Sequence, residues 1–200
     1  MKKGIIISFV LVFLGILIGV SFLLIRDANA QIPDETILID QNGEEYRFGD
    51  DHKKVKLIEF IYTFCPDICP TTTQKMNLLK KDLQNKGVYG KDVEFITITI
   101  DPYRDTTDEL RKYMEKFEIE NDGNWIFLTG DPQNIKDAHT KIRSVADSLQ
   151  FQYRDPGDGY LVHTSMTFLV DENNKFIKKF PMGEDFNKDQ VFETIMENLE

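Results

Sequence analysis

Two runs of eight residues, both almost continuously apolar, constrain the fold most strongly. Residues 55–62 read VKLIEFIY, in which only Lys56 and Glu59 are charged, and residues 93–100 read VEFITITI. Apolar runs of this length, rich in β-branched side chains, are typical of strands that are covered on both faces of a sheet. The chain is therefore expected to build a buried central sheet with helices on its faces.

Helical patterns alternate with these strands. Residues 71–86 place Met76, Leu79 and Leu83 on one stripe at helical spacing, and Gly87 follows at the end of the pattern. The alternation predicts right-handed crossovers and a mixed sheet, in a thioredoxin-like three-layer α/β sandwich. The other predicted elements are helices over 106–117, from Pro132 onward and from the cap Asn187 to Leu199, strands over 36–40, 46–48, 125–128, 167–170 and 176–180, and a polar loop over 151–160.

A separate N-terminal segment precedes this domain. Residues 5–25 carry no charge and are long enough to span about 30 Å as a helix, the thickness of a bilayer core. Lys2 and Lys3 precede the run, which predicts a cytoplasmic N-terminus and a domain on the extracytoplasmic side. Residues 28–30, Ala-Asn-Ala, also fit a cleavage site. Residues 1–30 are therefore interpreted as a single-pass transmembrane helix that anchors the chain in the cell membrane, or as a removable signal segment.

The composition of the remaining 170 residues restricts the partners of the domain. Residues 31–200 carry 21 Lys and Arg against 33 Asp and Glu, a net charge of −12. A domain of this size can bury a sizeable core without disulfides. Its acidic balance argues against nucleic acid as a partner, because binding to phosphates requires a basic surface.

The two cysteines of the chain lie four positions apart, in the sequence CPDICP over residues 65–70, directly after the strand at 55–62. Residues at this spacing on a helix lie about 6 Å apart, which suits either a disulfide or two sulfurs on one metal ion. The N-terminus of the following helix also favours thiolate over thiol. A purely structural disulfide would close so short a loop that it would add little stability. Cys65 and Cys69 are therefore candidates for a catalytic redox role or for metal binding.

Among the three histidines, His163 is the candidate ligand. It precedes the predicted strand at 167–170, and in a thioredoxin-like layout the loop before this strand lies against the cysteine turn. His52 lies in a charged turn and His139 in a predicted helix, and both are interpreted as surface residues. Soft thiolate ligands suit Cu(I), while imidazole suits copper and zinc.

Four segments carry a distinctive combination of motifs: IYTFCPDICPTTT at 61–73, TIDPYRDT at 99–106, WIFLTGD at 125–131 and HTS at 163–165. Together they resemble the SCO/SenC family of proteins. The resemblance extends over residues 34–199. Val162 departs from the family pattern, because many members carry an aspartate immediately before the histidine. This chain therefore lacks a carboxylate near the ligand set.

The resemblance implies a thioredoxin-like domain over residues 31–200 that binds a copper ion, Cu(I) or Cu(II), through Cys65, Cys69 and His163. It also implies a metallochaperone that assists assembly of the binuclear copper centre of cytochrome c oxidase, with the copper-centre subunit as its partner. The alternative is a thiol–disulfide oxidoreductase in which Cys65 attacks, and Cys69 resolves, a disulfide at the oxidase copper site. An upstream thiol reductant is expected as a further partner, because a disulfide must be reduced before its sulfurs bind copper.

Overall fold

The computed structural model describes residues 2–28, 30–50 and 53–199, with only the backbone described for residues 2–5 and 22–28. Asn29 of the expected cleavage site and His52 therefore lie outside the described residues. Contacts divide the chain into two units, Met1–Ala30 and Gln31–Glu200.

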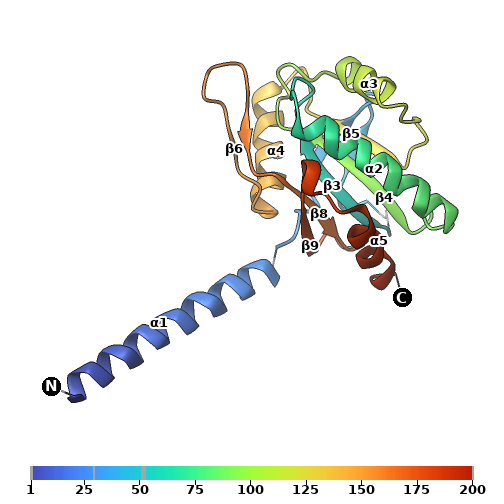
Figure 1. The fold of residues 1–200 in the computed structure, drawn as a ribbon. Coiled ribbons are helices and arrows are strands. Elements are labelled where there is room, and N and C mark those ends of the chain that lie inside the picture. Colours follow the sequence, from blue (N-terminus) through green and yellow to red (C-terminus); the bar gives the residue numbers. More distant parts are fainter. Residues whose placement is uncertain (1, 29, 51–52, 200) are drawn as a thin grey trace. The chain divides into compact units, whose positions relative to one another are not determined.

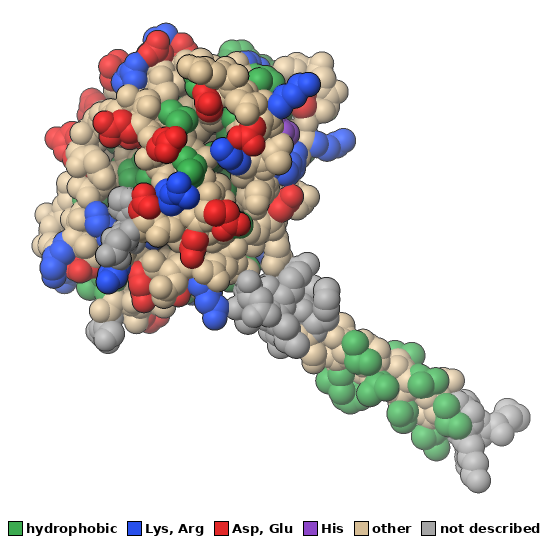
Figure 2. Space-filling view, turned by 180° about the vertical axis from the view of Figure 1, so that it is seen from behind, with side chains coloured by type: hydrophobic (Ala, Val, Ile, Leu, Met, Phe, Trp, Pro, Cys, Tyr) green, Lys and Arg blue, Asp and Glu red, His purple; other side chains and the backbone are tan. Residues whose placement is uncertain are grey.

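The first unit is the helix α1 (Lys2–Ala28). All its described side chains, at residues 6–21, are exposed, and most of them are apolar (Figure 2). Within the part of the chain that is described, no helix is both long and apolar enough to cross a membrane.

A seven-stranded mixed sheet forms the centre of the second unit (Figure 1). Its three parallel strands, β3 (Val55–Ile61), β4 (Val93–Thr99) and β5 (Trp125–Thr129), consist entirely of buried residues. The order is β2-β1-β5-β4-β3-β8-β9, with β1 antiparallel to β5 and β8 antiparallel to β3. The predicted mixed sheet is thus confirmed. The outer strands are β1 (Ile37–Asp40), β2 (Glu45–Arg47), β8 (Met166–Val170) and β9 (Phe176–Pro181).

Helices cover both faces of the sheet. The helix α2 (Ile68–Asn85) packs beside α5 (Lys188–Glu197) on one face (Figure 1). The helix α3 (Thr107–Lys116) lies next to α2, where the Tyr113 hydroxyl is 3.0 Å from Thr73 Oγ1. The helix α4 (Ile135–Ser148) follows β5 and covers the opposite face on the way to β8.

The structure corrects two of the predicted helix starts. The helix α2 begins at Ile68 rather than Thr71, because Pro70 fits the first turn, where its missing N–H would have no helical acceptor. The helix α4 begins at Ile135 rather than Pro132. Asp131 holds the preceding residues in a turn instead, since its side chain accepts from the Gln133 N–H and its carbonyl accepts from the Asn134 N–H.

The segment predicted as a polar loop over 151–160 is also different. It begins with the fully buried Phe151 and contains the short strand β6 (Tyr153–Arg154). This strand pairs antiparallel with β7 (Val162–His163), with Tyr153 opposite His163. The two strands are too short for sequence periodicity to reveal, and they form a hairpin that presents His163.

The close approach of β5 and α4 gives a test of the packing. A Cβ atom on Gly130 would lie 2.0 Å from the Cβ of Ala138 in α4. We therefore expect Gly130→Ala to lower the free energy of unfolding by about 1–3 kcal/mol through overpacking. Denaturant unfolding of the full chain measures this change.

The control is Ala138→Gly, which alone should cost about 1 kcal/mol through helix propensity. In the double variant the 2.0 Å contact is gone and only the 3.1 Å approach to the Cα of residue 138 remains, so its stability should return most of the way to that of Ala138→Gly. Strictly additive losses would show that the two residues do not meet.

Candidate metal centre

The cysteine turn joins the carboxyl end of β3 to the first turn of α2. The Cys65 N–H donates to the Tyr62 carbonyl at 3.0 Å, and the Cys69 N–H points at Cys65 Sγ at 3.5 Å. Both residues are free thiols. Cys65 is 9% exposed, whereas Cys69 is fully buried, so Cys65 is the more accessible of the two sulfurs.

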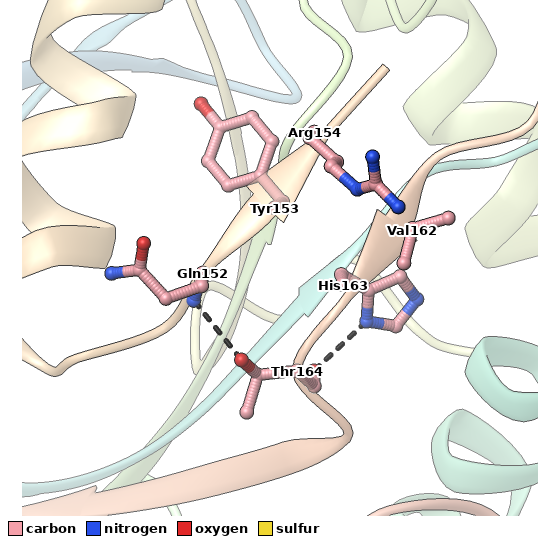
Figure 3. Close-up of a pocket in the computed structure, with 6 residues that line it drawn as sticks. All are labelled: Gln152, Tyr153, Arg154, Val162, His163 and Thr164. Carbon is pink, nitrogen blue, oxygen red and sulfur yellow. Dashed lines mark hydrogen bonds between the residues drawn. The ribbon is translucent and has the colours of Figure 1, made fainter. Parts of the chain in front are cut away.

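The β6–β7 hairpin brings His163 to this turn. Its Nε2 lies 3.9 Å from Cys69 Sγ, and its Nδ1 lies 2.9 Å from the Thr164 carbonyl oxygen (Figure 3). A carbonyl oxygen can only accept, so Nδ1 carries a proton. Nε2 then presents a lone pair to the cysteine pair when the ring is neutral and an N–H when the ring is protonated. Such a bond on the far nitrogen is how proteins orient a metal-binding histidine.

Aromatic side chains fix the imidazole on two sides. Phe151 stacks on the ring, with centroids 5.7 Å apart and planes at 24°, and Tyr62 meets it edge-on at 6.1 Å. Phe151 in turn stacks on Phe60 of β3 at 4.4 Å, so the ring rests on the core. Tyr62 ended the apolar run in the sequence and could have been identified from that position, but nothing local marked Phe151.

The pKa values of the two cysteines are shifted in opposite directions. The hydrogen bond from Cys69, helped by that from His163, lowers the pKa of Cys65 to about 4 although burial opposes it. The same bond to Cys65, together with burial, raises the pKa of Cys69 well above its ordinary value. At neutral pH the pair therefore holds one thiolate, on Cys65, and one thiol, on Cys69.

His163 retains a proton more readily than a free imidazole. Burial lowers its pKa, but the hydrogen bonds to the Cys65 sulfur and to the Thr164 carbonyl outweigh burial and raise the pKa above its ordinary value. The ring nitrogen Nε2 lies 3.9 Å from Cys69 Sγ, and the donor atoms of His163 and the two cysteines all lie within 4.8 Å of one another.

A buried carboxyl group lies on the α2 side of the sheet beneath the turn. Glu59 of β3 is fully buried and accepts from the hydroxyls of Thr97 at 2.8 Å and Thr73 at 3.1 Å. Burial raises the pKa of Glu59 to about 7, although these two hydrogen bonds oppose the change. The thiolate of Cys65 also raises it, which shows that the carboxyl senses the charge of the cysteine pair.

One atom of each of Cys65, Cys69 and His163 forms a group within 4.8 Å of one another, the only such group of potential metal ligands among the described residues. Atoms bonded to one transition-metal ion lie roughly 3.5–4.5 Å apart, given bonds of about 2.0–2.3 Å. The three side chains therefore stand close to the spacing that a single ion requires.

Other side chains that carry potential metal-ligand atoms lie elsewhere. His139 packs near the rings of Tyr103 and Tyr153, and Asp101 forms an ion pair with Arg104 at a turn. Met76 and Met114 are buried in the core.

Comparison with known proteins agrees with this arrangement. The family model described as SCO1/SenC matches residues 27–200. The chain belongs to the SCO1/SenC family. An SCO2-like protein of Rickettsia typhi is 37% identical over 152 residues, which cover 76% of this chain and 71% of the relative.

Solved structures of the family share the fold. The crystal structure of Arabidopsis thaliana ScoI with copper bound matches with a TM-score of 0.67 at 27% identity, over 84% of this chain and 98% of that one. BsSco, described as a Sco-family cytochrome c oxidase assembly protein with a disulfide switch, matches with a TM-score of 0.71 at 25% identity, over 85% and 94%. The predicted α/β thioredoxin-like fold is confirmed by these matches.

The acid strength of Cys65 can be read from its alkylation rate. We expect the rate with iodoacetamide in the full-length chain to stay nearly constant from about pH 8 to about pH 5, because only the thiolate reacts. The rate should fall as the pH drops through about 4, where the thiolate is protonated.

Cys69→Ala removes the hydrogen bond that contributes most to this low pKa. Its profile should shift towards the ordinary thiol range of about 8–9. A wild-type midpoint already in that range would refute the sulfur–sulfur hydrogen bond.

Proposed function

We propose that this chain is a copper-binding metallochaperone that supplies the binuclear copper centre of cytochrome c oxidase. Cys65, Cys69 and His163 are its copper ligands. The observation that carries the proposal is the convergence of their three donor atoms within 4.8 Å, with Cys65 already ionised.

The chemistry of the three donors favours copper over harder ions. Thiolates prefer Cu(I), and imidazole accepts Cu(I) or Cu(II), whereas magnesium and calcium require oxygen ligands. The group contains two sulfurs, one nitrogen and no carboxylate. Three protein ligands also leave a coordination position for a donor from the acceptor protein.

Related proteins support both the cargo and its destination. A relative at 27% identity has copper bound, and BsSco belongs to a family of cytochrome c oxidase assembly proteins. The acceptor for this chain is then the copper-centre subunit of the oxidase. Cys65 is the more exposed of the two sulfurs, so an incoming thiolate of that subunit would bind the copper as the bond to Cys65 Sγ breaks.

The same proposal locates the domain outside the cytoplasm. Residues 5–25 act as a membrane anchor, with Lys2 and Lys3 on the cytoplasmic side, and residues 31–200 form the copper-binding domain. Cysteine pairs readily oxidise outside the cytoplasm. An upstream thiol reductant therefore keeps Cys65 and Cys69 reduced before copper binds.

Loss of the imidazole should weaken copper binding. We expect His163→Ala to weaken the affinity for Cu(II) about 10–100-fold, since one ligand and its orienting bond to Thr164 disappear. Cys65→Ser or Cys69→Ser should abolish the sulfur-to-copper charge-transfer absorption. The measurement is a titration of the reduced full-length chain in detergent micelles.

His139→Ala is the matched control, because His139 is a partly buried imidazole that lies outside the ligand group. Its copper affinity should equal that of the wild type. Equal affinities of wild type, His163→Ala and His139→Ala would remove His163 from the ligand set.

A second function is favoured by the inequality of the two sulfurs. Cys65 combines a low pKa with partial exposure, as an attacking thiolate requires, and Cys69 is a buried thiol. The Cys65 thiolate would attack a partner disulfide and form a mixed disulfide, releasing one partner thiolate. Deprotonated Cys69 would then attack Cys65 Sγ and release the second thiolate. The partner gains two electrons as this chain becomes Cys65–Cys69 disulfide.

This reductase activity predicts a trapped intermediate. Cys69→Ser cannot resolve the mixed disulfide, so a covalent adduct with the oxidised copper-centre subunit should accumulate on non-reducing gels. Cys65→Ser, which lacks the attacking sulfur, should form none. If neither variant forms an adduct while copper binds normally, the chain delivers copper without reducing its acceptor.

A further inference from the structure

An exposed connection joins the two strands of the hairpin that carries His163. Residues 154–160 are all exposed, and Gly157 and Gly159 adopt φ angles of 89° and 91°, which favour glycine. Two hydrogen bonds are internal to this connection, from the Gly157 N–H to Asp155 and from the Tyr160 N–H to Asp158. These local bonds shape the connection but do not attach it to the sheet.

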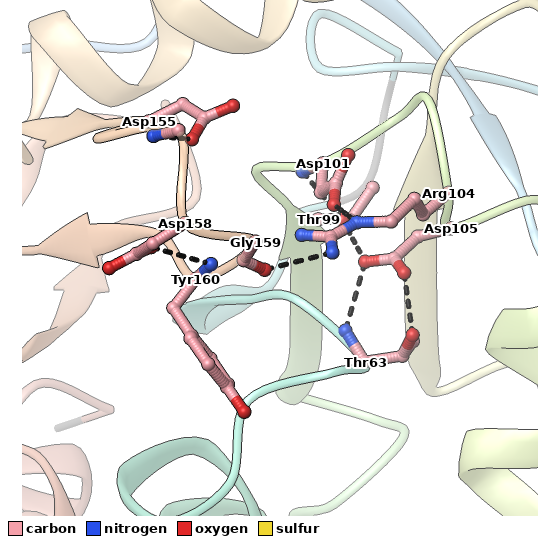
Figure 4. Close-up of polar contacts among 10 residues, drawn as sticks. Thr63, Thr99, Asp101, Arg104, Asp105, Asp155, Asp158, Gly159 and Tyr160 are labelled. Atoms are coloured by element: carbon pink, nitrogen blue, oxygen red, sulfur yellow. Dashed lines mark hydrogen bonds and ion pairs between the residues drawn. The ribbon is translucent and has the colours of Figure 1, made fainter.

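Arg104 attaches this connection to the end of the sheet (Figure 4). Its guanidinium donates to the Gly159 carbonyl oxygen at 2.9 Å and forms an ion pair with Asp101. The Asp101 side chain is only 9% exposed, and its N–H donates to Thr99 Oγ1 at 3.0 Å, so the anchor of the arginine is part of the folded core.

The same arginine also reaches the cysteine turn. Its guanidinium lies 5.5 Å from the ring of Phe64, the residue immediately before Cys65. Phe64 stacks on Tyr160 of the hairpin connection, with ring centroids 5.9 Å apart. Arg104 and the Phe64–Tyr160 pair therefore form a latch between the hairpin and the cysteine turn.

We infer that Arg104 is a positioning residue that latches the β6–β7 hairpin and so holds His163 over the two cysteines. The start of the hairpin is fixed independently, because Phe151 is buried and Arg143 donates to the Tyr153 carbonyl at 3.0 Å. The latch fixes its far end. The consequence for copper rests on the proposed function, whereas the latch itself does not.

The chain contains a closely matched control arginine. Arg111 also pairs with an aspartate three residues earlier, Asp108, and also donates to a distant backbone carbonyl, that of Gln41. Its side chain is 43% exposed, against 42% for Arg104. Arg111 contacts the β1 end rather than the hairpin, so it matches Arg104 in chemistry and differs in position.

The first experiment is amide hydrogen exchange on the metal-free, reduced full-length chain. Arg104→Gln should speed exchange in residues 157–163, and Arg111→Gln should leave that segment unchanged, because local opening depends on local contacts. Phe64→Leu removes the ring stack with Tyr160, so it should also speed amide exchange in residues 157–163. Equal exchange in both arginine variants would overturn the latch.

The second experiment tests whether the latch acts through His163. Arg104→Gln should weaken Cu(II) affinity about tenfold, as loss of outer support for a ligand does. In a His163→Ala background it should cause no further loss, because the residue that it positions is gone. An equal loss in both backgrounds would overturn the positioning role.

The two experiments separate the latch from the proposed function. A chain that binds no copper would refute the metallochaperone proposal, and the exchange result would still decide whether Arg104 holds the hairpin. Faster exchange in Arg104→Gln alone supports the latch in either case.

Discussion

One buried carboxylate joins the strand ends on which the cysteine turn is built. Asp105 is fully buried, and it accepts from the N–H and hydroxyl of Thr63 and from the hydroxyl of Thr99, while its own carbonyl accepts from Thr129. These threonines follow or end β3, β4 and β5. Burial raises the pKa of Asp105, and its hydrogen bonds oppose that change. Because Thr63 lies two residues before Cys65, this junction fixes where the turn leaves the sheet.

The two sulfurs and the imidazole are positioned in different ways. The sulfurs are placed by adjoining secondary structure, since Cys65 follows β3 and Cys69 lies in the first turn of α2. His163 arrives from a hairpin nearly a hundred residues later, and its ring depends on packing against Phe151 and Tyr62. The sulfur pair is thus rigid and preformed, whereas the imidazole depends on contacts between distant segments. Contacts of the hairpin therefore determine where the third proposed ligand lies.

Much of the fold and of the candidate site could be predicted from the sequence. The features that could not be predicted depend on contacts between distant segments. The strand at 55–62, the following helix and the cysteine pair between them carry strong local patterns, and the order of elements indicated that His163 would reach the turn. The hairpin strands are two residues long and arise from tertiary contacts, so periodicity could not reveal them. Arg104 and Gly159 lie 55 positions apart, and neither residue alone indicates the other. Glu59 was visible as a charge in a buried strand, but its hydrogen-bond partners were not.

We propose that one copper ion is held by both sulfurs and by the imidazole of His163. X-ray absorption at the copper edge of the copper-loaded, reduced full-length chain measures this ligand set directly. This ligand set predicts scattering from two sulfurs together with the multiple-scattering pattern of one imidazole. The imidazole pattern should disappear in His163→Ala. A spectrum with nitrogen and oxygen neighbours but no sulfur, or an imidazole pattern that persists in His163→Ala, would contradict it.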